Sequence, residues 1–360
     1  MITQTPDAQA QEPLKIGIAG LVHSHVHWLL GREDRGDIRI VGIAEPDRAL
    51  AQRYAEQYGF SMDLVYDSLD ELLKKAKPEA VCAFTSIRDH LEVVQKCAPK
   101  GVHVMVEKPL ALNVEQAQQM AALARQHKVQ LLTNYETSWY GSNQRIFRMV
   151  HEQRQLGDVK KTNVYAGHQG PNVVVQEPEF LNWLTDPEQN GGGALMDFGC
   201  YGANLITWMM KGEKPESVTA VVQNLQLEEY PRVEDDATIV LRYPQAQGVI
   251  QASWNWPYNR KEMEVYCEKG AVFSLDAASM RLITPDHPES NRIPAPKVMA
   301  PFNDPFAYLE AVVRGRIKVQ PTDLSALENN LTVMEILDAA RRSAETGETV
   351  RVTYYQVKTD

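Results

Sequence analysis

The chain has 360 residues, 44% of them hydrophobic and 23% charged, and its formal net charge at pH 7 is −10. This composition is typical of a globular protein in water, and a chain of this length usually forms two domains. An acidic chain without a block of lysine or arginine does not suit a phosphate backbone, so we expect no nucleic acid partner. No apolar run is long enough to span a bilayer, so we expect no membrane association.

The N-terminus and the cysteines indicate the compartment. Residues 1–13 are polar and lack the basic start and apolar core of a signal peptide. The four cysteines are widely separated and form no CxxC pair, which is typical of reduced thiols. We therefore predict a cytoplasmic protein. The sequence leaves open whether an export signal precedes it.

Strand-like and helix-like runs alternate through the first third of the chain. Helices between apolar strands indicate βαβ units, and therefore a parallel sheet. Ser68 and Glu71 form a capping box at the start of one helix. The expected strands are residues 14–20, 37–47, 79–86, 102–109 and 130–135, and the expected helices are residues 48–59, 68–78, 89–101 and 113–129.

After about residue 135 the pattern changes to closely spaced strands. Their apolar and polar residues alternate, which predicts an antiparallel sheet with one covered face. A long amphipathic helix is expected over residues 323–347. The expected strands are residues 160–168, 216–226, 236–244, 248–256, 262–270 and 271–277.

Three alternating histidines, His23, His25 and His27, follow the first strand. An HxH pair can hold a divalent metal, as in a metal-dependent hydrolase. Such a site needs further ligands, and no other histidine of the sequence lies in a comparable pair. We therefore predict no metal site and keep the metal hydrolase as an alternative.

The position of these histidines suits a dinucleotide-binding turn. Gly20 lies where the first strand ends and a helix is expected, which is where the GxGxxG motif begins. Val22 and His25 occupy the other two glycine positions, so the motif is incomplete. We expect Gly20, Val22 and the His25 backbone to approach the pyrophosphate of a cofactor.

Three polar residues complete this predicted cofactor site. His23 would face the phosphates, and Ser24 would cap the helix or contact phosphate. Glu45 ends the second strand, where a carboxylate can accept hydrogen bonds from the adenosine ribose and repel a 2′-phosphate. The pattern therefore favours NAD, with NADP left open because Arg48 is near.

Two further motifs carry side chains suited to catalysis. Glu107 and Lys108 follow a buried strand, at the edge of a parallel sheet where ligands bind. A lysine there can bind a substrate hydroxyl and stabilise charge during hydride transfer. Asp197 and Tyr201 follow three glycines at i and i+4 spacing, so both lie on one face if the segment is helical. A carboxylate beside a phenol can act as an acid–base pair.

These segments together resemble the glucose–fructose oxidoreductase / inositol dehydrogenase / MocA family over nearly the whole chain. The shared segments are KIGIAG, TSIRDH, GVHVMVEKPLAL, GGGALMDFGCY and ALENNLTVMEILDAARRSAETGETV. The resemblance implies an α/β protein with two domains. Residues 1–134 would form a Rossmann domain with a doubly wound parallel sheet that binds NAD(P). Residues 135–360 would form an α+β domain with a large, mainly antiparallel open sheet that makes homo-oligomer contacts, as a dimer or tetramer.

The resemblance also implies roles for individual residues. Lys108, Asp197 and Tyr201 match catalytic positions, and Thr85, His90 and Glu107 match positions near the nicotinamide or its ribose. Many members have histidine where Tyr201 stands, and tyrosine occurs in branches that act on sugars and diols. We therefore expect oxidation of a sugar or polyol, with Tyr201 as proton acceptor and its pKa lowered by Lys108.

Aromatic and histidine side chains of the second domain would complete the substrate pocket. Trp183 and His168 are predicted to contact substrate beside the catalytic residues. Two alternatives keep the fold: a redox-neutral enzyme that cleaves glycosides with bound NAD, and a non-catalytic sensor of NAD or sugar. The sequence selects neither the sugar nor the reaction direction.

Overall fold

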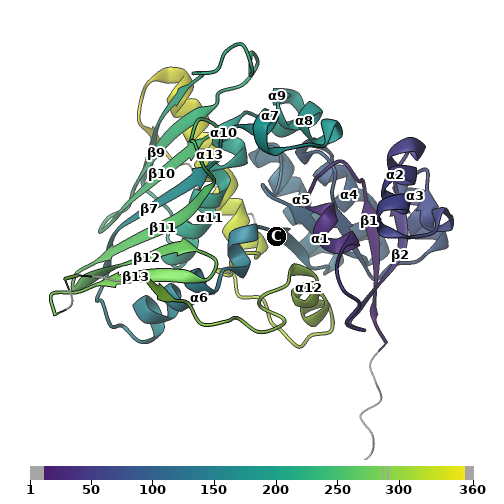
Figure 1. The fold of residues 1–360 in the computed structure, drawn as a ribbon, viewed down its shortest axis with the longest axis horizontal. Helices are drawn as coiled ribbons and strands as arrows, with labels where there is room; N and C mark the ends of the chain where they lie inside the picture. Colours follow the sequence, from purple (N-terminus) through teal and green to yellow (C-terminus); the bar gives the residue numbers. More distant parts are fainter. Residues whose placement is uncertain (1–11, 287, 290–291, 353–360) are drawn as a thin grey trace, which may run out of the picture.

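The computed structural model describes residues 12–286, 288–289 and 292–352, which form two sheets with helices between and around them (Figure 1). The first sheet is parallel, with the order β3-β2-β1-β4-β5-β6. This is the predicted doubly wound sheet, and its topological switch point lies between β1 and β4. Its strands are β1 (Leu14–Ala19), β2 (Ile38–Ala44), β3 (Val65–Tyr66), β4 (Ala80–Ala83), β5 (His103–Glu107) and β6 (Leu131–Asn134).

Local chemistry sets the ends of the helices that cover this sheet. Asp47 caps α2 by accepting hydrogen bonds from two backbone N–H groups, and Gly59 ends it in a left-handed conformation. The Ser68 hydroxyl accepts from the Glu71 N–H, as the capping box predicted. The helices are α1 (Val26–Leu30), α2 (Arg48–Tyr58), α3 (Leu69–Lys75), α4 (His90–Cys97) and α5 (Val114–His127).

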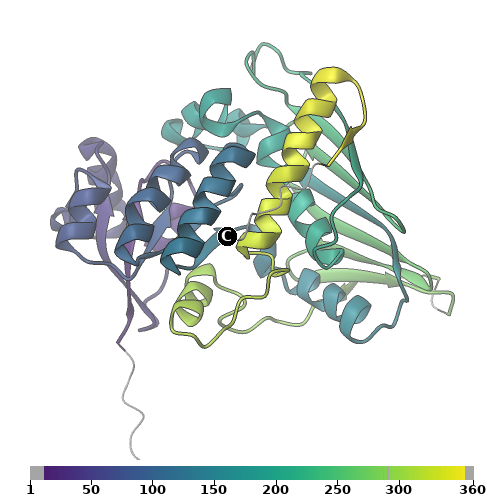
Figure 2. The ribbon, with the colours of Figure 1, turned by 180° about the vertical axis from the view of Figure 1, so that it is seen from behind.

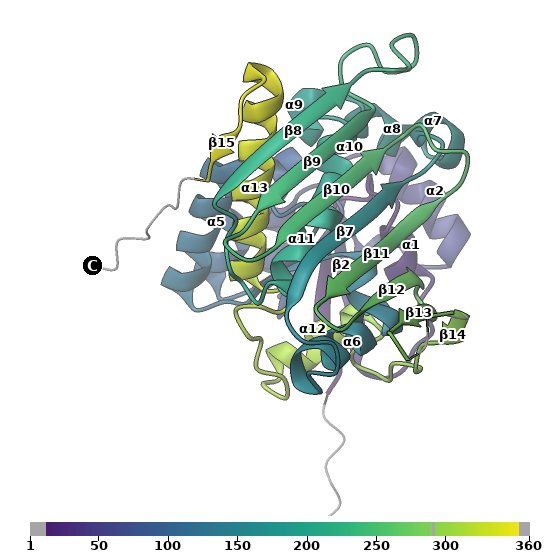
Figure 3. The same cartoon turned by 90° about the vertical axis from the view of Figure 1, so that its left-hand side faces the viewer.

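The second sheet has nine strands in the order β14-β13-β12-β11-β7-β10-β9-β8-β15. It is mainly antiparallel, as predicted, and β7 and β10 form its parallel pair. Figure 3 shows the face of this sheet that no helix of the described chain covers. Its strands are β7 (Val159–Gly167), β8 (Ser217–Gln223), β9 (Asp236–Arg242), β10 (Gln247–Ser253), β11 (Arg260–Cys267), β12 (Gly270–Asp276), β13 (Ser279–Ile283), β14 (Arg292–Pro294) and β15 (Val350–Arg351).

Helices on the covered face of this sheet join it to the first domain. The long helix α13 packs on α11, on β8 and on α5 of the first domain, between the two sheets (Figure 2). Near the C-terminus, α12 returns to the first sheet, where Phe306 and Leu309 join the buried cluster around β1. The helices of this region are α6 (Gly141–Phe147), α7 (Pro171–Val174), α8 (Pro178–Leu184), α9 (Pro187–Asn190), α10 (Ala194–Asp197), α11 (Gly199–Met209), α12 (Pro305–Val313) and α13 (Leu327–Thr346).

The structure differs from the sequence prediction in the glycine-rich segment. The single helix expected there is divided in two at Phe198, which stays in the right-handed helical region but has a φ of −108°, far from the regular helical value. The long C-terminal helix begins at Leu327 rather than at residue 323. None of the helices in the described part of the chain is long and apolar enough to cross a membrane.

Candidate active site

The carboxyl edge of the six-stranded sheet carries a buried ion pair between Lys108 and Asp197. Lys108 follows β5 directly, and Asp197 is the last residue of α10. The Lys108 ammonium contacts the Asp197 carboxylate and donates a hydrogen bond to the Asp197 carbonyl oxygen at 3.2 Å. The Trp254 indole N–H donates to the other carboxylate oxygen at 3.0 Å. The two charged side chains are 7% and 5% exposed, so the pair is held away from bulk water.

The protonation state of this pair follows from two opposing effects. Burial disfavours both charges, so by itself it would lower the pKa of Lys108 and raise that of Asp197. Mutual attraction outweighs burial, so the pKa of Lys108 lies above its ordinary value and that of Asp197 below it. At neutral pH the site therefore holds an ammonium and a carboxylate.

Tyr201 lies beside this pair but keeps its proton. Its ring centroid is 5.2 Å from the Lys108 ammonium nitrogen, and the ring packs on Phe198 and Tyr135. The sequence-based prediction that Lys108 lowers the pKa of this phenol is wrong. Burial raises the pKa of Tyr201 well above its ordinary value, and the negative charge of Glu136 raises it further.

A second ion pair, which sequence reasoning missed, lies on the same tyrosine. Glu136 follows β6 and Lys261 lies on β11, and their charged groups are in contact. The Lys261 ammonium nitrogen is also 5.2 Å from the Tyr201 ring centroid. The Tyr140 hydroxyl donates a hydrogen bond to the free oxygen of Glu136. The Lys261 and Glu136 side chains are 24% and 32% exposed, so water reaches this pair.

His168 follows β7 and joins the same cluster, and its predicted contact with substrate stays a prediction. Its ring meets Phe198 edge to face, with ring centroids 4.8 Å apart. The Gly170 N–H donates to its Nδ1 at 2.9 Å, which leaves the ring proton on Nε2. Burial lowers the pKa of His168 to about 4, so the ring is a neutral hydrogen-bond donor at neutral pH.

Two of the three histidines after β1, His23 and His25, gather around Glu107, whereas the His27 Nε2 lies 3.2 Å from a carboxylate oxygen of Glu177. The His25 Nδ1 lies 2.8 Å from one carboxylate oxygen of Glu107, and the Asn134 amide donates to the other oxygen at 2.8 Å. The His23 Nε2 lies 4.0 Å from the same oxygen as His25 and has no hydrogen-bond partner among the described residues. Burial lowers the pKa of both rings well below the ordinary value and raises that of Glu107.

This cluster gives the metal alternative a geometric basis, since the ligand atoms of His23, His25 and Glu107 lie within 4.8 Å of one another. Hydrogen bonding opposes it. The backbone N–H of His25 donates to the His23 Nδ1 at 3.1 Å, so the ring proton of His23 is on Nε2. Nε2 is the nitrogen that faces Glu107 and would have to bind a metal. The absence of a metal stays a prediction.

Backbone N–H groups of the turn between β1 and α1 already donate hydrogen bonds to other parts of the protein. The Leu21 N–H donates to one oxygen of Glu45 at 2.9 Å, and the Asp47 N–H donates to the other at 2.9 Å. The carboxylate thus ties together the turns after β1 and β2. The predicted capping by Ser24 is wrong, because α1 begins after His25 and its first turn has no side-chain cap.

A cavity of about 250 Å³ lies beside Gly20, at the switch point of the sheet. Gly20 has φ +74°, and a Cβ atom there would lie 2.8 Å from the Thr85 side chain, so the turn needs glycine. This open space lies between the ends of β1, β2 and β4, where doubly wound sheets bind their ligands. Its lining includes Gly20, Pro46, Asp67, Ser68, Thr85 and Lys96.

The second domain covers the other side of this turn through α8. The Trp183 indole N–H donates to the Val22 carbonyl oxygen at 3.1 Å. The rings of Trp183 and Phe180 pack on His23, with centroids 5.5 and 4.9 Å away. Trp183 is therefore placed on the predicted cofactor turn, and its contact with substrate stays a prediction.

His90 lies fully buried near the EKP segment. Its Nδ1 donates to the Leu110 carbonyl oxygen at 3.1 Å, and within the described part of the chain its Nε2 has no hydrogen-bond partner. Burial lowers the pKa of His90 to about 4. Thr85 lines the cavity beside Gly20 and donates its hydroxyl to the Ser86 carbonyl oxygen.

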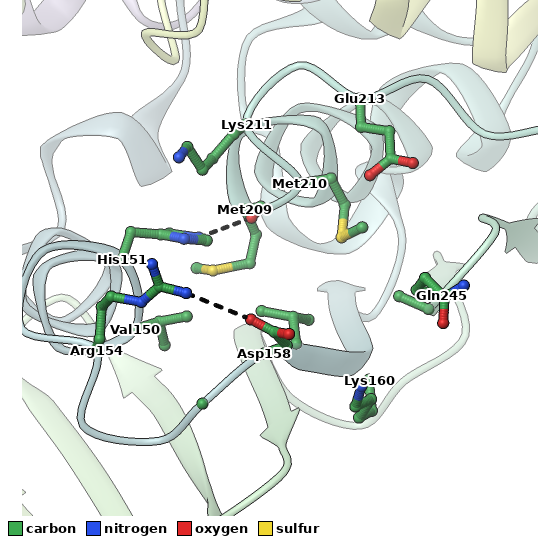
Figure 4. Close-up of a pocket in the computed structure, with 13 residues that line it drawn as sticks. Val150, His151, Arg154, Asp158, Lys160, Met209, Met210, Lys211, Glu213 and Gln245 are labelled. Carbon is green, nitrogen blue, oxygen red and sulfur yellow. Dashed lines mark hydrogen bonds and ion pairs between the residues drawn. The ribbon is translucent and has the colours of Figure 1, made fainter.

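A separate cavity of about 460 Å³ lies between the end of α11 and the start of β7 (Figure 4). Arg154 and Asp158 pair across its rim at 3.8 Å, and the His151 ring is hydrogen-bonded to the Met209 carbonyl oxygen. None of the residues predicted as functional lines it.

Two family models match the chain in succession. The Rossmann model, described as an oxidoreductase family with an NAD-binding Rossmann fold, matches residues 14–135. The GFO/IDH/MocA C-terminal domain matches residues 144–273. Both models describe the family that the sequence resembles through its segments GVHVMVEKPLAL and GGGALMDFGCY.

Curated relatives include dihydrodiol dehydrogenases of vertebrates. The trans-1,2-dihydrobenzene-1,2-diol dehydrogenase of Xenopus tropicalis is 32% identical over 184 residues, 51% of this chain and 52% of its own length. That of Sus scrofa is 28% identical over 236 residues, 66% of this chain and 65% of its own length. The chain thus matches about half to two thirds of the length of these relatives.

Solved structures share the fold along nearly the whole chain. An aldose–aldose oxidoreductase from Caulobacter crescentus, complexed with glycerol, has a TM-score of 0.78 and 22% identity over 94% of this chain and 99% of its own. GenD2 from gentamicin A biosynthesis, in complex with NAD, has a TM-score of 0.76 and 23% identity over 98% of this chain and 100% of its own.

Proposed function

The chain belongs to the GFO/IDH/MocA family of oxidoreductases, and we propose that it transfers hydride between NAD and a hydroxyl-bearing carbon of a sugar, polyol or glycoside. The observation that carries this proposal is the buried Lys108–Asp197 pair beside Tyr201, at the carboxyl edge of the Rossmann sheet. The names of two kinds of relative support a hydroxyl-bearing substrate, since one names a 1,2-diol and the other an aldose.

Residues on the carboxyl edge would hold the cofactor. The cavity beside Gly20 and Thr85 suits the adenosine half, and the Glu45 carboxylate at the same edge would repel a 2′-phosphate, which favours NAD. Glu107 and Lys108, at the end of β5, suit the nicotinamide half. NAD supplies the hydride acceptor when bound.

The protein's own groups hold the substrate oxygen and its proton. The Lys108 ammonium donates a hydrogen bond to that oxygen and stabilises negative charge on it, while Asp197 and Trp254 keep the ammonium in place. Tyr201 donates a second hydrogen bond. Since both groups carry protons at neutral pH, they suit the direction in which a carbonyl becomes a hydroxyl.

Oxidation of the hydroxyl needs a proton acceptor, and we assign this role to His25. Burial keeps its imidazole neutral, and the positive charges of Lys108 and Lys261 act in the same direction. With Nδ1–H donating to Glu107, the His25 Nε2 keeps a free lone pair. A neutral base oriented by a carboxylate is a common acid–base arrangement.

The uncovered face of the nine-stranded sheet supports the proposal of a homo-oligomer. Val221 on β8 and Tyr266 on β11 alternate with buried residues of the covered face and have exposed side chains. Apolar side chains on an open sheet suit contact with a second copy of the chain.

The first experiment identifies what the purified protein carries. The protein is denatured, the released small molecules are identified by mass spectrometry, and metal content is measured on the same sample. We expect NAD(H) without stoichiometric metal, followed by reduced-nicotinamide absorbance when sugars and polyols are added. Stoichiometric zinc or manganese, with neither bound nucleotide nor saturable NAD binding in a titration, would overturn the proposal. Glycoside cleavage without accumulated NADH would instead favour the redox-neutral alternative.

A further inference from the structure

The ion pair between Lys261 and Glu136 is assigned no contact with substrate in the steps described above, where its charges act only on the pKa values of His25 and Tyr201. Lys108 and Lys261 each place an ammonium nitrogen 5.2 Å from the Tyr201 ring centroid. The two nitrogens are therefore at most about 10 Å apart, twice that distance. One polyhydroxy ring can span the space between two such groups.

Lys261 stands in a place that packing alone does not explain. It shares one face of β11 with Met263 and Val265, which are both fully buried. A lysine on the covered face of a strand loses hydration, and here the contact with Glu136 offsets that loss. The chain thus keeps a charge on the covered face of the sheet, beside the ring of Tyr201.

Access distinguishes this pair from the catalytic one. The Lys261 and Glu136 side chains are 24% and 32% exposed, against 7% and 5% for Lys108 and Asp197. An ammonium beside a carboxylate presents a hydrogen-bond donor next to an acceptor, which matches a hydroxyl group that accepts from one and donates to the other.

We propose that Lys261 and Glu136 form a second hydroxyl-binding subsite, and that the substrate is an uncharged vicinal diol of the sugar or cyclic polyol class. This inference rests on the proposed function. Lys108 holds the reacting oxygen, and the Lys261–Glu136 pair holds the hydroxyl on the neighbouring carbon. The two ion pairs have no net charge together, so they leave no unpaired charge for a carboxylate or amine on the substrate.

The partial exposure of the pair sets the size of the expected effect. A fully buried site built for a hydroxyl can reject an analogue without it by roughly 10⁴-fold, because its polar groups stay unpaired. Here water can replace the missing hydroxyl, so we expect a preference of about 10- to 100-fold.

The test compares matched substrates with and without the second hydroxyl. Initial rates with NAD are measured for trans-cyclohexane-1,2-diol against cyclohexanol, and for D-glucose against 2-deoxy-D-glucose. The variants are Lys261→Met and Glu136→Gln, with Lys261→Arg to restore the charge. Lys160→Met is the matched control, because Lys160 pairs with Glu268 at 3.0 Å on the same sheet, at the cavity of Figure 4.

We expect the wild-type enzyme to prefer, in at least one pair, the compound that carries a hydroxyl on the carbon next to the reacting one. Lys261→Met and Glu136→Gln should reduce that preference at least tenfold, mainly through KM, while Lys261→Arg restores part of it and Lys160→Met leaves it unchanged. An unchanged preference in folded Lys261→Met would overturn the subsite and leave the proposed function standing. Wild-type enzyme that reduces NAD with none of these compounds would overturn both.

Discussion

Two lysine–carboxylate pairs lie on one tyrosine ring, and their environments differ sharply. Lys108 and Asp197 are almost completely buried, and Trp254 holds the carboxylate from behind. Lys261 and Glu136 make a similar contact, but a quarter to a third of each side chain is exposed. The same two chemical groups are thus sealed from water in one pair and open to it in the other.

Because the two pairs differ in burial, we expect them to have different roles in the enzyme. In the buried pair, separation would leave an uncompensated charge in a dry site, so its geometry is fixed and suits charge stabilisation during a reaction. In the accessible pair, water or a substrate hydroxyl can take the place of either partner at little cost. We therefore expect the buried pair to control turnover and the accessible pair to control the choice of substrate.

Among the substitutions considered, Lys108→Met should have the largest effect on turnover. It removes the hydrogen bond to the reacting oxygen, so we expect kcat to fall by about 10³-fold. It also leaves Asp197 buried without its partner, which should lower the free energy of unfolding by about 3–5 kcal/mol. Steady-state NADH absorbance and thermal unfolding measure the two effects.

A double variant separates catalysis from stability. Adding Asp197→Asn to Lys108→Met removes the unpaired charge and keeps an acceptor for the Trp254 N–H, so stability should recover while turnover does not. Recovery of turnover in the double variant would show that Lys108 acts only through folding.

Tyr201 lies between the two pairs, and its replacement should have the next largest effect. Tyr201→Phe removes a proton donor without changing the ring, so we expect kcat to fall by about 100-fold with little change in KM. Because burial and Glu136 raise the pKa of this phenol, it should stay protonated at every pH where the enzyme is active.

Ultraviolet difference titration of wild type against Tyr201→Phe measures this directly. We expect no phenolate signal from Tyr201 up to pH 10, since a raised pKa moves its ionisation to higher pH. A phenolate signal near neutral pH would restore Tyr201 as the proton acceptor and remove the need for His25.

Both residues of the buried pair could be predicted as site residues from the sequence, although their contact with each other could not, and neither residue of the accessible pair was predicted. Lys108 and Asp197 belong to short motifs whose spacing and place after a strand indicate chemistry. Glu136 and Lys261 are 125 residues apart and share no motif, and they meet only because the second sheet sits over the end of the first. One sign was present: Lys261 immediately precedes the predicted strand 262–270 and continues the alternation of Met263 and Val265, so a charge extends the apolar face of that strand.

The fold was predictable for a related reason. Hydrophobic periodicity and capping residues act locally, so the parallel sheet and the Ser68 cap could be derived from neighbouring residues. The packing of α8 on the turn after β1 depends on Trp183 and Val22, which are 161 residues apart. The raised pKa of Tyr201 likewise depends on burial, which the i, i+4 spacing of its motif does not specify.

Tyr140→Phe should have the smallest effect on the kinetics, and it tests whether the accessible pair acts on substrate binding alone. It removes one hydrogen bond to Glu136, whose other oxygen stays in contact with Lys261. Because water can reach the freed oxygen, we expect KM for the diol to rise only about threefold, with kcat unchanged. Steady-state rates on the diol and mono-alcohol pair measure it, with Tyr258→Phe, a largely exposed tyrosine, as the control. A fall in kcat comparable to that of Tyr201→Phe would mean that Glu136 acts in the reaction itself. It would overturn the proposal that the buried pair controls turnover and the accessible pair controls the choice of substrate.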